Sequence, residues 1–365
     1  MAKKSFKLPE LPPELDYSAI FSNIVSARDI VARFDEAVKR LPNPEIIQRT
    51  FETKEAVLSS RIEGTQADFD EVLLFDAQEI VSEENDKEKD YREISNYRLA
   101  IKQGKELLQK KPLSENLIKA LHKTLLNSVR GKNKAPGRFR KVQVYIGAYG
   151  TSIEQARYIP PPPQDIPRLF SNLEKYLHSG DEVDPLVKIA IAHYQFEAIH
   201  PFLDGNGRTG RLLIPLFIYE RKITAHPNIY VSEFLEEHRS VYYDLLNAVS
   251  EKNEWIPWIR FFLEAIRKQT ETSLKRVVKI EKLYKTLKEK IPAINSVYAN
   301  SFLDALFVKP RFTAKSIKKL SGVSNNQTLY TLIEKFLDAK IIIDITPGKE
   351  RNKIYAFGDL IKIVR

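Results

Sequence analysis

The chain has 365 residues, of which 43% are hydrophobic and 29% are charged, and it contains no cysteine. This composition is typical of a soluble globular protein long enough for two or three domains. It excludes disulfides, thiolate catalysis and cysteine-bound zinc. The formal net charge is +10. No signal peptide or membrane span is evident, so we expect a cytoplasmic protein with no membrane partner.

The positive charge belongs to the C-terminal part of the chain. Residues 271–365 hold 19 Lys and Arg against 9 Asp and Glu, whereas residues 1–270 hold 39 of each class. A nucleic-acid-binding surface is one explanation for the excess, and a solvated lysine-rich face is the other.

The N-terminal region predicts two helices after a proline-rich arm, the second over about residues 44–64. Gly64 has the position of a helix C-cap. Glu63 then lies in the last turn, where the helix dipole disfavours a carboxylate. This mismatch indicates a cationic partner for Glu63 elsewhere in the chain.

A β-hairpin is predicted by alternating apolar residues at 142–146 followed by Tyr158 and Ile159. Further along, Asp184 and Pro185 predict the start of a helix that runs to residue 199.

One face of that helix offers an alternative chemistry. His193, Glu197 and His200 follow one another at spacings of four and three. They could form a transition-metal site, as in a metal-dependent phosphohydrolase. The spacing is not HExxH, however, and no further ligand is evident.

Residues 200–211, HPFLDGNGRTGR, concentrate groups that bind phosphate and move protons. The glycines and the asparagine favour a nest of backbone N–H groups for an anion, at the start of a buried helix. Arg208 and Arg211 share one face and can both bind phosphate oxygens. Asp204 could hold Mg²⁺, and His200 titrates near neutrality. The stretch therefore predicts phosphoryl or nucleotidyl transfer.

The same stretch resembles the signature of the Fic family, HxFx(D/E)GNGRxxR. The resemblance holds at each specified position: His200, Phe202, Asp204, Gly205, Asn206, Gly207, Arg208 and Arg211. In all it covers about residues 45–266. It implies a mainly α fold, with a Fic-type helical core and a β-hairpin flap that aligns a target segment by strand addition.

The resemblance also implies an activity, that of a protein adenylyltransferase. AMP would pass from ATP, with Mg²⁺ on Asp204, to a Ser, Thr or Tyr hydroxyl of a target protein or of the chain itself. His200 would be the base, and Tyr243 would pack on the adenine. The residues implied in phosphate binding are Gly205, Asn206, Gly207, Arg208, Thr209, Gly210 and Arg211. Other Fic proteins transfer UMP or phosphocholine, and the same pocket could also remove AMP.

A second, shorter Fic pattern lies near the N-terminus. In the family a [S/T]xxxE[G/N] segment forms an inhibitory helix, and Ser59, Glu63 and Gly64 match it. By that resemblance Glu63 pairs with Arg211 and occupies the place of the γ-phosphate.

The C-terminal region predicts a lysine-rich linker helix and then a small winged-helix (α+β) domain. The predicted domains are therefore an N-terminal helical region (1–110), a Fic catalytic core (111–268) and the linker with the winged helix (269–365). Winged helices bind duplex DNA, here through residues 301–357, or serve in dimerisation and docking. A DNA-binding regulator with a nucleotide-sensing Fic core is thus a second hypothesis, and a homodimer stays open.

Overall fold

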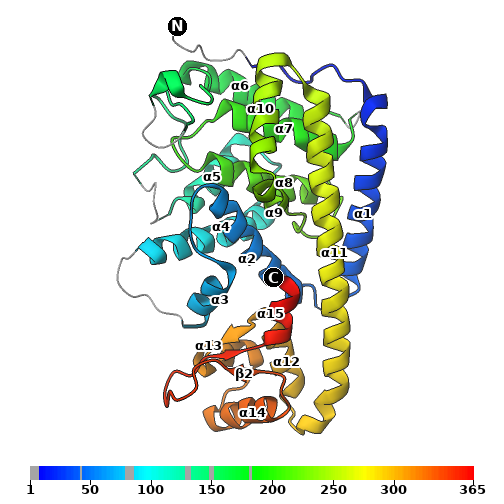
Figure 1. Ribbon diagram of the computed structural model, residues 1–365, viewed down its shortest axis with the longest axis vertical. Helices are drawn as coiled ribbons and strands as arrows, with labels where there is room; N and C mark the ends of the chain where they lie inside the picture. The colour runs from blue at the N-terminus through cyan, green and yellow to red at the C-terminus, as the bar shows by residue number, and fades with distance from the viewer. Residues whose placement is uncertain (1–7, 42, 79–85, 128–132, 148–151, 181–182) are drawn as a thin grey trace. The chain divides into compact units, whose positions relative to one another are not determined.

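The structure is a computed structural model that describes residues 8–365 except 42, 79–85, 128–132, 148–151 and 181–182. The described chain is mainly helical with one small antiparallel sheet (Figure 1), which confirms the predicted mainly α class. Its α-helices are α1 (Phe21–Lys39), α2 (Glu45–Ile62), α3 (Phe69–Gln78), α4 (Asp86–Leu108), α5 (Glu115–Leu125), α6 (Ile166–His178), α7 (Pro185–Ile199), α8 (Asn206–Glu220), α9 (Ser232–Glu237), α10 (Arg239–Lys252), α11 (Trp255–Ile294), α12 (Ala299–Val308), α13 (Ala314–Ser321), α14 (Asn326–Asp338) and α15 (Gly358–Val364). Its strands are β1 (Arg311–Phe312), β2 (Ile343–Asp344) and β3 (Tyr355–Ala356).

The chain forms two compact units, and neither is continuous in sequence. The first contains residues 1–35, 58–65 and 92–271, and the second contains residues 36–57, 66–91 and 272–365. This division differs from the predicted ranges 1–110, 111–268 and 269–365, because residues 36–57 and 66–91 pack with the C-terminal elements. The predicted ranges as domains stay a prediction.

Helices α7 and α8 form the centre of the first unit and pack against each other. Asp184 caps α7 by accepting a hydrogen bond from the Leu186 N–H at 2.8 Å, and Pro185 occupies the first turn. Nearly every residue of both helices is buried. A helix that is apolar on all sides must be enclosed by others, and α5, α6 and α10 pack on this pair.

Among the described residues, the predicted flap hairpin is represented by one antiparallel bridge. Ile146 and Tyr158 form an antiparallel bridge, with the Ile146 N–H bonded to the Tyr158 carbonyl at 2.8 Å. The Tyr158 hydroxyl anchors this side by donating to the Ala198 carbonyl at 2.9 Å. Residues 148–151, where the turn of the hairpin is expected, lie outside the described residues.

The second unit contains the three-stranded sheet, with strand order β1-β3-β2 and antiparallel pairing throughout. Helices α12, α13 and α14 and then the β2–β3 hairpin follow in the order predicted for the winged helix. Helix α3 packs on β1, and Arg311 donates to both the carbonyl and the carboxylate of Asp70 at 2.6 Å. The winged-helix assignment itself stays a prediction.

Within the described residues, no helix is both long and apolar enough to cross a membrane.

Candidate active site

The loop between α7 and α8 carries His200 to Gly205 and is held from both sides. His200 ends α7 in a left-handed conformation (φ 47°). Buried Arg140 fixes it, because its Nε donates to the His200 carbonyl at 2.9 Å while its own N–H donates to the Pro201 carbonyl at 2.9 Å. The Asn206 amide closes the loop, since its Oδ1 accepts from the Phe202 N–H and its Nδ2 donates to the Phe202 carbonyl, both at 2.9 Å. The Asn206 side chain therefore shapes the loop, and the backbone N–H groups remain for a phosphate.

His122, on α5, supports the same loop from below. Its ring stacks on Phe202 with centroids 3.7 Å apart. The Gly137 N–H can only donate, so it bonds a deprotonated Nδ1 at 2.8 Å, and the protonated Nε2 donates to the Asp204 carbonyl at 2.8 Å. Burial lowers the pKa of His122 to about 4. The ring is thus neutral, with both nitrogens used in positioning the loop.

His200 is arranged to accept a proton. Its Nδ1 lies 3.3 Å from the Glu197 carbonyl, and a carbonyl can only accept, so Nδ1 carries the hydrogen. The lone pair then belongs to Nε2. Burial lowers the pKa of His200 to about 4, which keeps the imidazole neutral at physiological pH. A neutral imidazole with an available lone pair is a general base.

The first turn of α8 provides an anion site. Gly205 caps the helix in a left-handed conformation (φ 74°), and the N–H groups of residues 206–208 have no intrahelical acceptor in a first turn. Gly207 keeps the approach open, because a Cβ there would lie 2.0 Å from the Glu63 Oε1. The Thr209 hydroxyl turns inward and donates to the Gly205 carbonyl at 2.8 Å. The predicted phosphate-binding residues are therefore brought together around one helix N-terminus.

Arg208 and Asp204 lie beside this turn. Arg208 is buried and forms an ion pair with Glu93 at 3.3 Å and with Asp204 at 3.4 Å. Its Nη1 is the atom that faces Glu93, and its Nε is buried without a hydrogen bond among the described residues. The Asp204 Oδ1 accepts from the Gly205 N–H, and its side chain is 38% exposed. One accessible carboxylate beside a phosphate site fits Mg²⁺, which takes few protein ligands.

The end of α2 carries the second predicted motif. The Thr65 N–H bonds the Ser60 carbonyl at 3.2 Å, and the Gly64 N–H bonds the Arg61 carbonyl at 2.9 Å. Gly64 is left-handed (φ 98°), so the helix ends in a Schellman motif with Gly64 at C′. Glu63 is consequently the C-cap residue of α2.

Arg211 supplies the cation that the position of Glu63 requires. Its Nη2 donates to the Glu63 Oε1 at 2.7 Å and to the Ser59 carbonyl at 2.8 Å, and its Nε donates to the Ser59 hydroxyl at 2.9 Å. The arginine side chain is 1% exposed. Burial opposes the charge of Glu63, but the Arg211 charge and hydrogen bond outweigh it, so the pKa of Glu63 is lowered.

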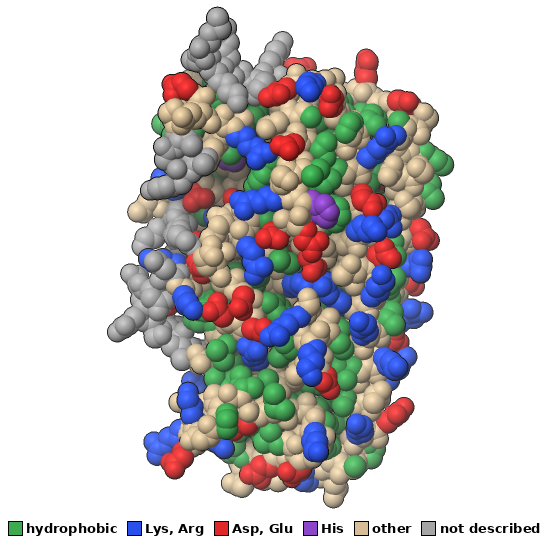
Figure 2. All heavy atoms as spheres, in the orientation of Figure 1, with side chains coloured by type: hydrophobic (Ala, Val, Ile, Leu, Met, Phe, Trp, Pro, Cys, Tyr) green, Lys and Arg blue, Asp and Glu red, His purple; other side chains and the backbone are tan. Residues whose placement is uncertain are grey.

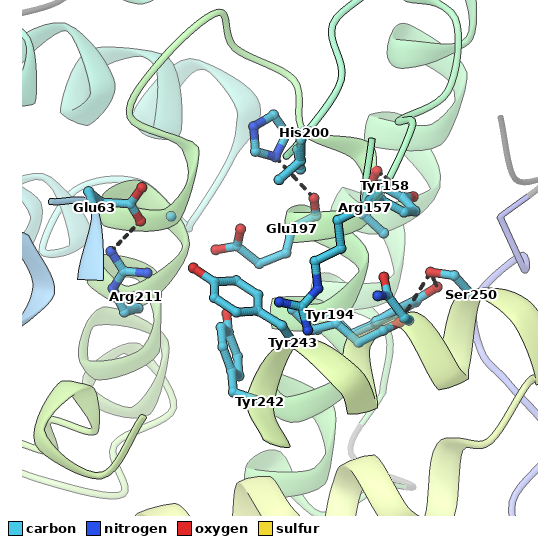
Figure 3. A pocket seen from close by; sticks show the side chains of 15 residues that line it. Glu63, Arg157, Tyr158, Tyr194, Glu197, His200, Arg211, Tyr242, Tyr243 and Ser250 are labelled. Atoms are coloured by element: carbon cyan, nitrogen blue, oxygen red, sulfur yellow. Dashed lines mark hydrogen bonds and ion pairs between the residues drawn. The ribbon is translucent and has the colours of Figure 1, made fainter. Parts of the chain in front are cut away.

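These residues line one cavity of about 110 Å³ (Figure 3). Glu63, Gly207 and Arg211 form its charged end, with His200 at the side. The rest of the lining comes largely from α7 and α10 and includes Tyr194, Tyr243, Leu246, Asn247 and Ser250. The Arg157 guanidinium covers the Tyr243 ring at 4.9 Å. The predicted adenine-packing residue Tyr243 therefore does lie in the cavity.

The metal-triad interpretation is wrong. Within the described residues, no group of three His, Cys, Asp or Glu could hold a metal ion. His193 donates from Nδ1 to the Gly210 carbonyl at 3.2 Å and accepts from the Tyr242 hydroxyl at 2.9 Å. Both nitrogens are thus used in packing α7 against α8 and α10, and burial lowers the pKa of His193 to about 3. The predicted metal site grouped Glu197 and His200 with His193 only because their spacing puts the three residues on one face of a helix.

Comparison with known proteins shows which family this site belongs to. Residues 112–218 match the family described as Fic/DOC family, and residues 21–106 match Fic/DOC family N-terminal. The chain belongs to the Fic/DOC family. Both matches together cover more than half of this Fic/DOC chain, and they confirm the resemblance drawn from its two motifs.

Relatives and solved structures agree. "Protein adenylyltransferase Fic" of Drosophila grimshawi is 31% identical over 188 residues, which are 51% of this Fic/DOC chain and 35% of that protein. The protein of the same name from Aedes aegypti is 29% identical over 46% and 32% of the two chains. This chain thus spans about a third of the length of these curated relatives.

Two solved structures show the fold. A Fic family protein from Desulfovibrio desulfuricans G20 has a TM-score of 0.61 at 19% identity, covering 95% of this Fic/DOC chain and 98% of that one. Fic-1 from C. elegans has a TM-score of 0.56 at 22% identity, covering 73% and 74%.

Proposed function

We propose that this chain is an autoinhibited protein adenylyltransferase, which transfers AMP from ATP to a Ser, Thr or Tyr hydroxyl of a target protein or of itself. The observation that carries the proposal is the pairing of a neutral, half-buried His200 with an anion site that a carboxylate at the end of α2 already occupies. The names of the curated relatives support the reaction class.

The transfer follows from the groups at the charged end of the cavity. The His200 Nε2 takes the proton of the target hydroxyl as its oxygen bonds to the α-phosphorus. The bond between the α-phosphorus and the bridging oxygen breaks, and diphosphate leaves. The N–H groups of residues 206–208 stabilise the charge on the α-phosphate oxygens, while Arg208 and Arg211 hold the β- and γ-phosphates.

Mg²⁺ would be held by Asp204 together with phosphate oxygens and water. When bound it neutralises part of the phosphate charge. The target would reach the cavity along the segment of Ile146, where Val142 and Tyr145 are exposed and an extended peptide can add as a strand.

Inhibition arises because the Arg211 guanidinium cannot bind the Glu63 carboxylate and the γ-phosphate of ATP at the same time. Arg211 spends three hydrogen bonds on Ser59 and Glu63, so a γ-phosphate must compete for it. A nucleotide bound beside Glu63 is displaced from the position that in-line attack on its α-phosphorus requires. A displacement of about 1 Å costs about 10²-fold in rate.

The decisive experiment compares auto-modification by the wild type, Glu63→Gly and Glu63→Gly with His200→Ala, using Mg–ATP labelled on the α-phosphate. We expect Glu63→Gly to exceed the wild type by about 10- to 10³-fold. We expect His200→Ala to remove at least about 10²–10⁴ of the gained rate, because the base is lost. Thermal melts of each variant provide the control for folding.

Two results would contradict the proposal. A normally melting Glu63→Gly protein with the wild-type rate would show that α2 does not inhibit. Unchanged transfer after His200→Ala would remove His200 from the chemistry.

A second function, binding of duplex DNA, is favoured by the C-terminal charge excess. The start of α14 presents exposed Asn326 and Gln327, and Tyr330 is 50% exposed. Figure 2, however, shows Lys and Arg interspersed with Asp and Glu on the face it displays. We propose that any such binding depends mainly on phosphate contacts, so it must weaken steeply with salt. A gel-shift titration of duplex DNA at about 50 and about 200 mM salt tests this proposal. The absence of a shift at low salt would contradict DNA binding and leave protein docking as the role of the C-terminal segment.

A further inference from the structure

We propose that Glu197 holds the ribose hydroxyls of the bound nucleotide and thereby selects ribonucleotides over deoxyribonucleotides. The inference rests on the proposed function and names a specificity-determining residue for it. Figure 3 shows the Glu197 carboxyl turned into the cavity, between His200 and Tyr243.

The cavity lining combines two chemistries. Gly207 and Arg211 suit an anionic group, whereas Tyr243 and Leu246 suit a planar apolar group. Figure 3 shows Arg211 on one side of Glu197 and Tyr194 and Ser250 on the other. A nucleoside triphosphate has the matching order of parts, with its sugar between the base and the phosphates. Glu197 lies on α7 one turn before His200, in the middle of this order.

The Glu197 carboxyl lacks the partners that a buried carboxyl needs. Its Oε1 is fully buried and has no hydrogen bond among the described residues. Because Oε1 packs against Gly210 and is closed to solvent, a ligand in the cavity can reach only the other carboxyl oxygen. That oxygen has two lone pairs and can accept from the vicinal hydroxyls of a ribose.

The Glu197 carboxyl has room because the residue next to it on α8 is a glycine. Gly210, on α8, is so close that a Cβ there would lie 2.3 Å from the Glu197 Oε1. A glycine at 210 therefore admits the carboxyl, just as the glycine at 207 admits that of Glu63.

The charges around Glu197 come from three helices. Arg211 on α8 attracts it, Glu63 at the end of α2 repels it, and the Tyr242 and Tyr243 rings of α10 face it. Burial raises its pKa to about 8, so at neutral pH the carboxyl can both donate and accept. A sugar hydroxyl has the same two capacities.

The test uses the Glu63→Gly protein as the parent and measures kcat/KM for transfer from ATP, 2′-deoxy-ATP and 3′-deoxy-ATP. We expect the parent to prefer ATP by about 10-fold or more, the effect of one lost hydrogen bond to a buried group. Adding Glu197→Ala should lower transfer from ATP to the level of the deoxynucleotides, so that the ratio approaches one. Glu197→Gln, which keeps the volume and a hydrogen-bonding end, should retain part of the preference.

Glu251→Gln is the matched control, because Glu251 is an exposed glutamate of α10, and it should keep the parent's preference. Equal losses with all three nucleotides would overturn the inference, since Glu197 would then act on Arg211 or on packing. An unchanged preference in both Glu197 variants would overturn it as well.

Calorimetric titration of the same nucleotides into the catalytically silent His200→Ala, Glu63→Gly protein separates the two proposals. A sugar preference in binding that Glu197→Ala abolishes would support the role of Glu197 even if no transfer is ever observed. Tight binding that ignores the sugar would contradict that role while leaving adenylyl transfer intact.

Discussion

At the scale of single residues, the backbone decides which nitrogen of each histidine carries the proton. His200 and His193 both have Nδ1 against a carbonyl, and His122 has Nδ1 against an N–H group. The three rings are neutral, but of the three only His200 lines the cavity (Figure 3). The histidine that the motif predicted as the base is thus distinguished from its two neighbours by its hydrogen bonds.

The low pKa of His200 predicts the pH dependence of transfer. The competent form is neutral, so activity is lost as pH falls through the folded-state pKa, which lies near 4 rather than 6.5. The negative charge of Glu63 raises the pKa of His200. Removal of that charge in Glu63→Gly therefore cannot move the acid limb of the pH profile to higher pH. We expect kcat/KM of that variant to stay level from pH 8 to about 5.5 and to fall below it. An acid limb at pH 6.5 or higher would contradict a His200 pKa that burial has lowered.

The sequence could predict the residues that carry the chemistry but not those that hold them. His200, Asp204 and Arg211 belong to a continuous motif whose residue types match phosphate chemistry. His122 and Arg140 act on backbone carbonyls of the same loop from 60 or more positions away. Since any carbonyl can accept such a bond, no residue pattern marks the partner.

At the scale of elements, α2 brings two groups to Arg211 because Ser59 and Glu63 are one helical turn apart. The unfavourable place of Glu63 at a helix C-terminus predicted a cation, and the Schellman motif explains why the residue is there. Identifying that cation as Arg211, 148 positions away, required the family resemblance.

This arrangement predicts a graded release of inhibition. Ser59→Ala removes the acceptor of the Arg211 Nε but leaves the Ser59 carbonyl and Glu63 in place. We expect auto-modification to rise several-fold, well short of Glu63→Gly, because one neutral acceptor is worth about 1 kcal/mol. Initial rates of the two variants, measured in parallel, provide the comparison. A rate equal to that of Glu63→Gly would show that Ser59, and not the carboxylate, holds the arginine.

At the scale of the whole molecule, the two compact units share several helices. Helices α1, α2, α4 and α11 each contribute residues to both units. The change of charge near residue 270 suggested a cut that falls within α11, where the helix continues without a break (Figure 1). Composition changes along a chain report on its surface, whereas a compact unit is defined by contacts between distant segments.

Removal of residues 272–365 should therefore damage more than the C-terminal segment. Leu73 of α3 is buried against Ala356 and Ile361, and Lys54 of α2 donates to the carbonyls of Val364 and Arg365 at 3.1 and 2.8 Å. Without them, we expect new chymotryptic cleavage at Phe51, Phe69 and Phe75, within residues 45–57 and 66–78, and a melting temperature lowered by several degrees. Limited proteolysis of the full and shortened chains decides the matter. A shortened chain as resistant as the full one would show that residues 1–271 fold independently.

The glycine at position 207 constrains how this protein can change over generations. Because a side chain there would collide with the Glu63 carboxylate, it would also obstruct the phosphate that takes the same place in the proposed mechanism. A mutation at 207 thus cannot relieve inhibition without harming the enzyme. Mutations at Ser59 and Glu63 face no such conflict, because neither group takes part in transfer in the proposed mechanism. Natural variation in basal activity among closely related sequences should accordingly be found in α2, while the glycine stays unchanged.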